Sequence, residues 1–181
     1  KWLQEELFQY GYEEVDSAFF HKYNYAFGTN PESIIEAWND GVGVINYRGW
    51  GDARGWHKPE FRLNEIESML NPSIKLPVVF SFVCNTGDFG NDIEPSFGEA
   101  LLRASNKGAV GYIGGSNNTY WDEDYWWAVG NTSNFTANPT YNATGLGVYD
   151  CLMHENGEHK DDWFITQGQI IHSGNLAVTQ A

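Results

Sequence analysis

Cysteines and long apolar segments are nearly absent from this sequence. It has two cysteines in 181 residues, Cys84 and Cys151, which is too few for the disulfide framework of a small secreted domain. No run of about twenty apolar residues occurs, so no membrane span is expected. Lys1 is not followed by a charged and then apolar leader. We therefore expect a mature or excised fragment of a larger protein.

Basic residues are also scarce. The chain has 10 Lys and Arg against 24 Asp and Glu, a formal net charge of -14. Nucleic-acid binding depends on clustered Lys and Arg, so this composition argues against a nucleic-acid partner. It favours cationic substrates or metal ions instead. The histidines show no spacing typical of metal ligands, so no catalytic metal is expected.

The order of apolar and helical segments predicts an α/β domain. Apolar runs indicate strands at 42–47, 78–83 and 109–113. Helical periodicity and end signals indicate helices at 2–10, 30–38, 64–70, 95–106 and 161–173, with Asn30 capping the second helix and Gly174 following the last. A long loop is expected at 131–144. Strands separated by helices predict one domain, 1–181, with a mostly parallel sheet covered by helices on both faces.

Two loops leave the first two predicted strands and carry candidate chemistry. Cys84 directly follows the apolar run 76–83, at the carboxyl end of a strand, where open α/β folds hold their active sites. His57 is the only histidine in the glycine-rich loop 47–57. If the strands are adjacent, a thiol and an imidazole meet, as in cysteine hydrolases. The alternatives are a small buried Cys84 and a surface or capping His57.

Four segments carry a resemblance to a known family. They read Gly-Val-Gly-Val-Ile-Asn-Tyr-Arg-Gly-Trp-Gly at 41–51, Cys-Asn-Thr-Gly-Asp-Phe at 84–89, Pro-Ser-Phe-Gly-Glu-Ala-Leu-Leu-Arg-Ala at 95–104, and Gly-Tyr-Ile-Gly-Gly-Ser-Asn-Asn-Thr-Tyr-Trp-Asp-Glu-Asp-Tyr-Trp-Trp at 111–127. In this order they resemble the catalytic domain of gingipains, especially the lysine-specific gingipain over 112–130, and the similarity runs from about 2 to 181. Several specific motifs in series are stronger than any one of them.

The resemblance implies a fold, an activity and a location. The fold is a caspase-like three-layer α/β sandwich, and the activity is that of a bacterial, secreted or cell-surface cysteine endopeptidase. Such an enzyme cleaves protein or peptide substrates after basic residues, through an acyl-enzyme on a Cys thiolate, and Cys84 matches the nucleophile. Gingipains also carry a preceding subdomain and a following immunoglobulin-like domain, which we expect as partners within the same polypeptide.

The general base departs from the family pattern. Gingipains have His-Gly where this chain has Trp50-Gly51, and an indole N–H only donates. One hypothesis is that His57 takes the vacated role, since glycines make this loop adaptable. A second is a non-catalytic binding or scaffold module that has lost the family histidine. A third is a sortase-like acyl transferase, because the same thioester can pass its acyl group to an amine.

The resemblance also assigns substrate-binding residues. Trp121 and Asp124 match the aromatic and carboxylate residues that shape the pocket for a basic side chain, and Trp50 and Arg48 border it. Arg48 replaces a small hydroxyl residue, so one alternative is that it pairs with Asp124 and fills the pocket. Another alternative for 121–127 is a helix start with acids at the positive end of its dipole.

The resemblance also implies an oxyanion hole and a calcium site, and the chain offers candidate residues for both. Acyl transfer needs backbone donors for the oxyanion, and the N–H groups of Cys84 and Gly51 are the candidates, with a simple turn role as the alternative for Gly51. Gingipains hold calcium, and three acids, Asp88, Asp92 and Glu94, crowd one loop. They lack the periodicity of a calcium loop, so solvated acids are the alternative to a structural calcium. No cofactor is required by this chemistry.

Overall fold

The protein is described from a computed structural model that covers 2–9, 11–15, 31–70, 75–130, 147–149, 159, 161 and 163–181. The chain divides into two compact units. The sheet unit is 16–120, and the helical unit combines 1–15 with 121–181. Each unit is described by itself. Among the described helices, none has the length and apolar character needed to cross a bilayer.

Three parallel strands form the central sheet of the sheet unit. In this sheet, sheet A, the strand order is β1 (Val44–Arg48), β5 (Val78–Phe82) and β6 (Gly111–Gly114). All three predicted strands are therefore confirmed. Arg48 pairs in register with Phe82, so the loops after β1 and β5 leave the same edge of the sheet. The adjacency on which the thiol–imidazole hypothesis depended is thus confirmed.

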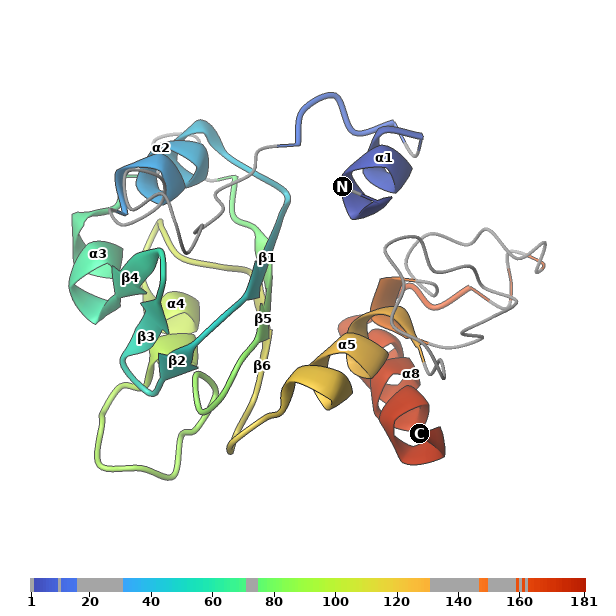
Figure 1. The fold of residues 1–181 in the computed structure, drawn as a ribbon. Helices are drawn as coiled ribbons and strands as arrows, with labels where there is room; N and C mark the ends of the chain where they lie inside the picture. Colours follow the sequence, from blue (N-terminus) through green and yellow to red (C-terminus); the bar gives the residue numbers. More distant parts are fainter. Residues whose placement is uncertain are drawn as a thin grey trace, which may run out of the picture. The chain divides into compact units, whose positions relative to one another are not determined.

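Three helices of the sheet unit lie on one side of sheet A (Figure 1). They are α2 (Glu32–Asp40), α3 (Leu63–Ser68) and α4 (Phe97–Arg103). At its C-terminus α2 stops at Gly41, whose φ of 93° is left-handed and suits glycine. At its N-terminus α4 has a capping box formed by Ser96 and Glu99. The helices predicted at 30–38, 64–70 and 95–106 are confirmed, with bounds that differ by one to three residues at each end.

A second, antiparallel sheet occupies the segment that we expected to be a loop. Sheet B consists of β2 (Gly51–Asp52), β3 (Gly55–His57) and β4 (Glu60–Arg62). The expectation of an irregular loop at 47–57 is wrong. Its strands have two or three residues and abundant glycine, so they show no alternation long enough to recognise. They are held by the burial of Trp56 and Phe61, which are 1% and 0% exposed.

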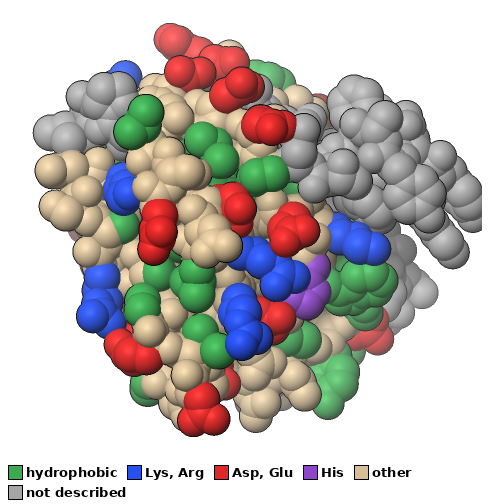
Figure 2. Space-filling model, turned by 90° about the vertical axis from the view of Figure 1, so that its left-hand side faces the viewer, with side chains coloured by type: hydrophobic (Ala, Val, Ile, Leu, Met, Phe, Trp, Pro, Cys, Tyr) green, Lys and Arg blue, Asp and Glu red, His purple; other side chains and the backbone are tan. Residues whose placement is uncertain are grey.

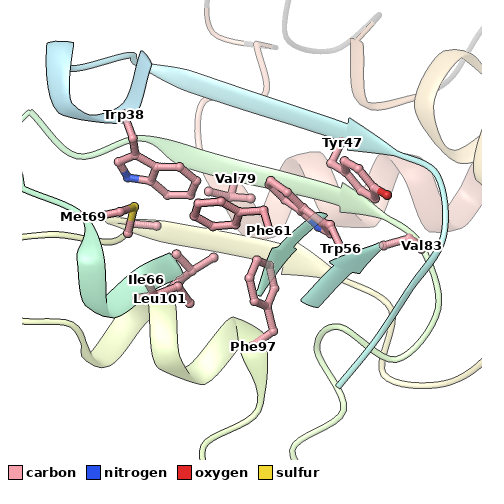
Figure 3. Close-up of a cluster of buried hydrophobic side chains, with 11 residues drawn as sticks. Trp38, Tyr47, Trp56, Phe61, Ile66, Met69, Val79, Val83, Phe97 and Leu101 are labelled. Carbon is pink, nitrogen blue, oxygen red and sulfur yellow. The ribbon is translucent and has the colours of Figure 1, made fainter. Parts of the chain in front are cut away.

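Aromatic side chains dominate the core between sheet A, sheet B and the helices (Figure 3). The rings of Tyr47 and Trp56 stack with centroids 4.4 Å apart, and those of Trp38 and Phe61 with centroids 5.3 Å apart. Trp38, Trp56, Phe61 and Phe97 are thus structural residues of this core. On the opposite face of sheet A, Phe80, Phe82 and Ile113 are buried as well. Burial on both faces fits the predicted α/β sandwich.

The helical unit contains α1 (Trp2–Gln9), α5 (Trp121–Val129) and α8 (Gln167–Gln180). The last helix was expected at 161–173, so its predicted bounds are wrong. The helix begins after the cap Thr166 and continues through Gly174, where a Cβ atom would lie 2.5 Å from Trp127 Cε2. Glycine here allows close packing and does not end the helix. The predicted cap Asn30 and loop 131–144 lie outside the described residues.

Candidate active site

Cys84 lies in the turn that directly follows the central strand β5. Its thiol is half-buried and not in a disulfide. The Thr119 backbone N–H donates to Sγ at 3.3 Å, and Sγ donates to the Thr119 carbonyl oxygen at 3.4 Å. The thiol is therefore fixed against the loop that follows β6. Sequence reasoning missed Thr119, and no motif connects it with Cys84 across 35 residues.

The backbone around Cys84 is held in one conformation. Asn85 has φ 56°, a left-handed value that asparagine tolerates better than most residues. The Asn85 N–H donates to the Asn117 carbonyl at 3.0 Å, and the Gly87 N–H to the Gly115 carbonyl at 2.9 Å. Two hydrogen bonds thus join the turn to the 115–119 loop. Such a constraint presents the thiol in a fixed orientation, as a nucleophile requires.

A buried chain of polar groups lies under this turn. The Trp56 indole N–H donates to Ser81 Oγ at 2.9 Å, and Ser81 Oγ lies 2.9 Å from Thr86 Oγ1. Ser81 and Thr86 are 1% and 0% exposed. These bonds join sheet B through Trp56, β5 through Ser81 and the Cys84 turn through Thr86. Sheet B and the nucleophile turn are therefore positioned by one network.

Gly51, the candidate oxyanion donor, lies against the residues that flank Cys84. A Cβ atom on Gly51 would be 3.0 Å from Thr86 Cγ2 and 3.3 Å from Val83 Cγ2. A larger residue would push β2 away from the turn. Gly51 is thus more than a turn residue, since it allows this close approach. Its oxyanion role stays a prediction.

The backbone of His57, in β3, bonds to that of Trp50, the residue directly before β2. The His57 backbone N–H donates to the Trp50 carbonyl at 2.8 Å, one step beyond the Gly51–Trp56 pair of the ladder. Side chains of opposed residues in an antiparallel pair share a face. Since Trp56 faces the core, Trp50 and His57 share the opposite face of sheet B. His57 is therefore a close neighbour of Trp50, the position that the resemblance predicts for the family histidine.

The imidazole of His57 has a carboxylate partner. Its Nε2 lies 2.9 Å from Asp52 Oδ2, and the side chains are 33% and 43% exposed. Burial raises the pKa of Asp52, but hydrogen bonds from the Arg54 backbone N–H and the His57 ring lower it by more, so it lies below its ordinary value. An ionised Asp52 favours the Nε2–H tautomer and leaves Nδ1 as an acceptor. Sequence reasoning missed Asp52, although its five-residue spacing before His57 across a turn was a signal.

The thiol and the imidazole do not hydrogen-bond to each other among the described residues. Cys84 Sγ bonds with Thr119, and His57 Nε2 with Asp52. Catalytic hydrogen bonds often form only when substrate is bound. His57 as general base therefore stays a prediction.

The remaining predicted residues fall on three elements. Arg48 ends β1 and is exposed, and Trp50 is 56% exposed with Lys58 Nζ 5.8 Å from its ring centroid. Trp121 and Asp124 are in the first turn of α5, so the alternative of a helix start with acids at its positive end is confirmed. Their pocket role, and a pairing of Arg48 with Asp124, stay predictions.

Two of the three acids considered for calcium accept hydrogen bonds within the sheet unit. Asp88 Oδ1 accepts from the Gly90 N–H at 3.1 Å, and Glu94 Oε1 accepts from Arg103 at 2.7 Å. In the part of the chain that the structure describes, no three His, Cys, Asp or Glu side chains are grouped to hold a metal ion. A structural calcium held by Asp88, Asp92 and Glu94 stays a prediction. Cys151 and His154 lie outside the described residues.

Known proteins match this chain in sequence and in fold. Residues 3–180 match the model of peptidase family C25. Lys-gingipain of Porphyromonas gingivalis is 36% identical over 143 residues, which are 79% of this chain and 8% of the relative. Gingipain R2 of the same organism is 34% identical over 119 residues, 64% of this chain and 15% of the relative. The chain thus spans a small part of both relatives.

Solved structures support the fold class. A structure described as a protease superposes with a TM-score of 0.73 at 33% identity, over 83% of this chain and 32% of its own. The crystal structure of the Arg-specific cysteine proteinase gingipain R superposes with a TM-score of 0.74 at 24% identity, over 98% of this chain and 36% of its own. The predicted caspase-like α/β fold is confirmed.

Proposed function

The chain belongs to peptidase family C25, and on that premise we propose that it is the catalytic part of a cysteine endopeptidase that cleaves after basic residues. The names of its relatives, Lys-gingipain and the Arg-specific gingipain R, support a basic substrate side chain. Because the chain covers 8% of Lys-gingipain, we also propose that it is one part of a longer polypeptide. We also propose that the protein is secreted or held at the cell surface.

The position of Cys84 carries this proposal. Its Sγ is fixed by Thr119 at the carboxyl end of β5, and Gly51 packs against the residues on both sides of it. The thiolate would attack the scissile carbonyl carbon, and the backbone N–H groups of Cys84 and Gly51 would stabilise the oxyanion. The C–N bond then breaks and leaves a thioester, which water hydrolyses to the acid and the free thiol.

His57 is the proposed general acid and base. It would take the thiol proton on Nδ1 and give it to the leaving amine, while Asp52 holds Nε2 and stabilises the imidazolium. The backbone hydrogen bond from His57 to Trp50 and the 2.9 Å contact between the His57 ring and Asp52 support this role. Asp52 is a positioning residue on this proposal, because it acts through the imidazole.

A kinetic experiment tests the assignment. In the full-length protein, thiol-dependent cleavage of Lys and Arg substrates is expected, and Cys84→Ala should abolish it. His57→Ala should lower kcat/KM by about a hundredfold to ten-thousandfold, the usual contribution of general-base catalysis. His172→Ala is the matched control, because His172 is exposed on α8. Asp52→Asn should shift the pH profile of kcat. If His57→Ala, Asp52→Asn and His172→Ala all lowered kcat/KM by the same small factor, the role of His57 would be refuted.

The reactive thiol can be identified by chemistry alone. A thiol paired with imidazole alkylates faster near neutral pH than a buried unpaired one. Brief iodoacetamide treatment and mass mapping should find Cys84 modified before Cys151. Faster labelling of Cys151 would contradict the assignment of the nucleophile.

The substrate pocket has its own test. Asp124→Asn should lower kcat/KM for Lys or Arg substrates by about tenfold or more, because one charge-assisted hydrogen bond is lost. Cleavage of neutral substrates should change little. Equal losses on both substrate types would show that Asp124 supports the fold rather than specificity.

A binding module without catalysis is the second candidate. The observation that favours it is Trp50, a residue unable to accept a proton, at the position of the family histidine. If the full-length protein shows no thiol-dependent cleavage of a diverse peptide library, and Trp50→His creates it, this candidate replaces the peptidase. Adding an amine nucleophile to the same assay tests acyl transfer, since a transferase would yield the amide instead of the acid.

A further inference from the structure

Positive charge is concentrated in one short segment of this acidic chain. Segment 48–62 holds four of the 10 basic residues but two of the 24 acidic ones, so its net charge is +2 in a chain of net charge -14. The four cations are Arg48, Arg54, Lys58 and Arg62. All but the first belong to sheet B or its turns. A positive region on a negative protein attracts anionic partners selectively.

The two acidic residues of the segment both contact other residues of the same segment. Asp52 pairs with His57 at 2.9 Å, and Glu60 Oε1 lies 3.3 Å from Arg62 Nε. Arg54 and Lys58 are exposed in the turns at the two ends of β3. Within the described residues, the Arg54 guanidinium makes no ion pair. Its charge is therefore available to a partner.

An exposed tryptophan lies beside these cations. Trp50 is 56% exposed, and Lys58 Nζ lies 5.8 Å from its ring centroid. Tryptophan and arginine are the residues most enriched among binding hot spots. On the face of the molecule in Figure 2, Lys and Arg side chains gather beside a histidine. We name the group Trp50, Arg54, His57 and Lys58 the sheet B surface.

We propose that the sheet B surface binds an acidic peptide segment of a partner protein. Charge complementarity selects the anion, and the exposed Trp50 adds apolar contact area beside Lys58. Arg54 and Lys58 are four residues apart, in the turns that flank β3, a span of at most about 13 Å at the rise of a β-strand. An extended peptide with two acidic residues four positions apart matches this spacing. Binding does not require the Cys84 thiol, so it can be measured in a variant that lacks this thiol.

A binding assay on the whole protein tests the proposal. The probe is a fluorescein-labelled peptide Gly-Ser-Glu-Gly-Phe-Gly-Glu-Ser-Gly, and its comparison has Gln at both Glu positions. Neither contains a basic residue for the proposed peptidase to recognise. The acidic peptide should bind the Cys84→Ala variant about fivefold or more tightly than the Gln peptide, and salt should weaken it. Unchanged binding in Cys84→Ala separates this proposal from the fate of the catalytic one.

Matched charge variants locate the site. Arg54→Gln with Lys58→Gln should lower affinity for the acidic peptide about fivefold, the scale of two exposed ion pairs. Arg103→Gln with Lys107→Gln removes the same charge from another part of the sheet unit and should change affinity less than twofold. Equal effects of the two pairs, or equal binding of both peptides, would overturn the proposal. Tighter binding of a single-stranded oligonucleotide than of the peptide would also overturn it, in favour of a general anion site.

Discussion

Replacing Ser81 by alanine removes the hydroxyl at the centre of the polar network under the Cys84 turn. Two hydrogen bonds of 2.9 Å are lost, one from the Trp56 indole N–H and one with Thr86 Oγ1. Trp56 is 1% exposed, so water cannot replace the missing acceptor. A buried donor left without a partner costs about 1–3 kcal/mol, and the second bond adds about 1 kcal/mol. We expect Ser81→Ala to lower the free energy of unfolding by about 2–4 kcal/mol.

Thermal and chemical unfolding measure this loss. For a chain of this length, about 2–4 kcal/mol corresponds to a Tm lower by roughly 5–15 °C. The matched control is Ser68→Ala at the exposed end of α3, where the hydroxyl donates to the Glu65 carbonyl and the change should stay within about 0.5 kcal/mol. In the double variant Ser81→Ala with Trp56→Phe the unpaired donor is gone. The double variant should therefore lose less stability than the sum of the losses in the two single variants.

A loss below about 0.5 kcal/mol for Ser81→Ala would refute the reasoning, because it would show that the network does not hold the indole. Strict additivity with Trp56→Phe would refute it as well. Under the proposed function, Ser81→Ala should also lower kcat/KM, since the network joins sheet B to the nucleophile turn.

Three further predictions concern other parts of the chain. Ser96→Ala removes the hydroxyl that donates to Glu99 Oε2 at 2.8 Å at the start of α4 and should cost about 0.5–2 kcal/mol in chemical unfolding; no change would show that this hydroxyl is dispensable. Gly174→Ala should lower Tm although alanine favours helices, because its Cβ would lie 2.5 Å from Trp127 and overpacking costs about 1–3 kcal/mol; a higher Tm would contradict that packing. The pKa of Asp52 is lowered in the folded state, so its contribution to stability is present above its unfolded pKa of about 3.9 and is lost as pH falls through the folded pKa; Asp52→Asn should flatten the decline in stability below about pH 4, and an unchanged slope would argue against the pair with the imidazole.

Local patterns located most of the regular structure. The strands of sheet A and helices α2 and α4 follow from apolar runs and cap residues that lie within a few positions of each other. The bounds of α8 could not be found in this way, because Gly174 marks a helix end by propensity but packs against Trp127 in the structure. Sheet B could not be predicted from local patterns either. Its strands are too short to show a period, and burial of Trp56 and Phe61 holds them in place.

The sequence by itself determined that Cys84 follows a buried strand in a parallel α/β fold, because strand periodicity and the thiol's position are local properties of the chain. Only the tertiary structure decided what meets that thiol and the histidine. Thr119 contacts Sγ from 35 residues away. The fold of sheet B joins the His57 backbone to Trp50 and the His57 ring to Asp52. Such pairings depend on register and on the packing of distant segments, and no local pattern of residues encodes them.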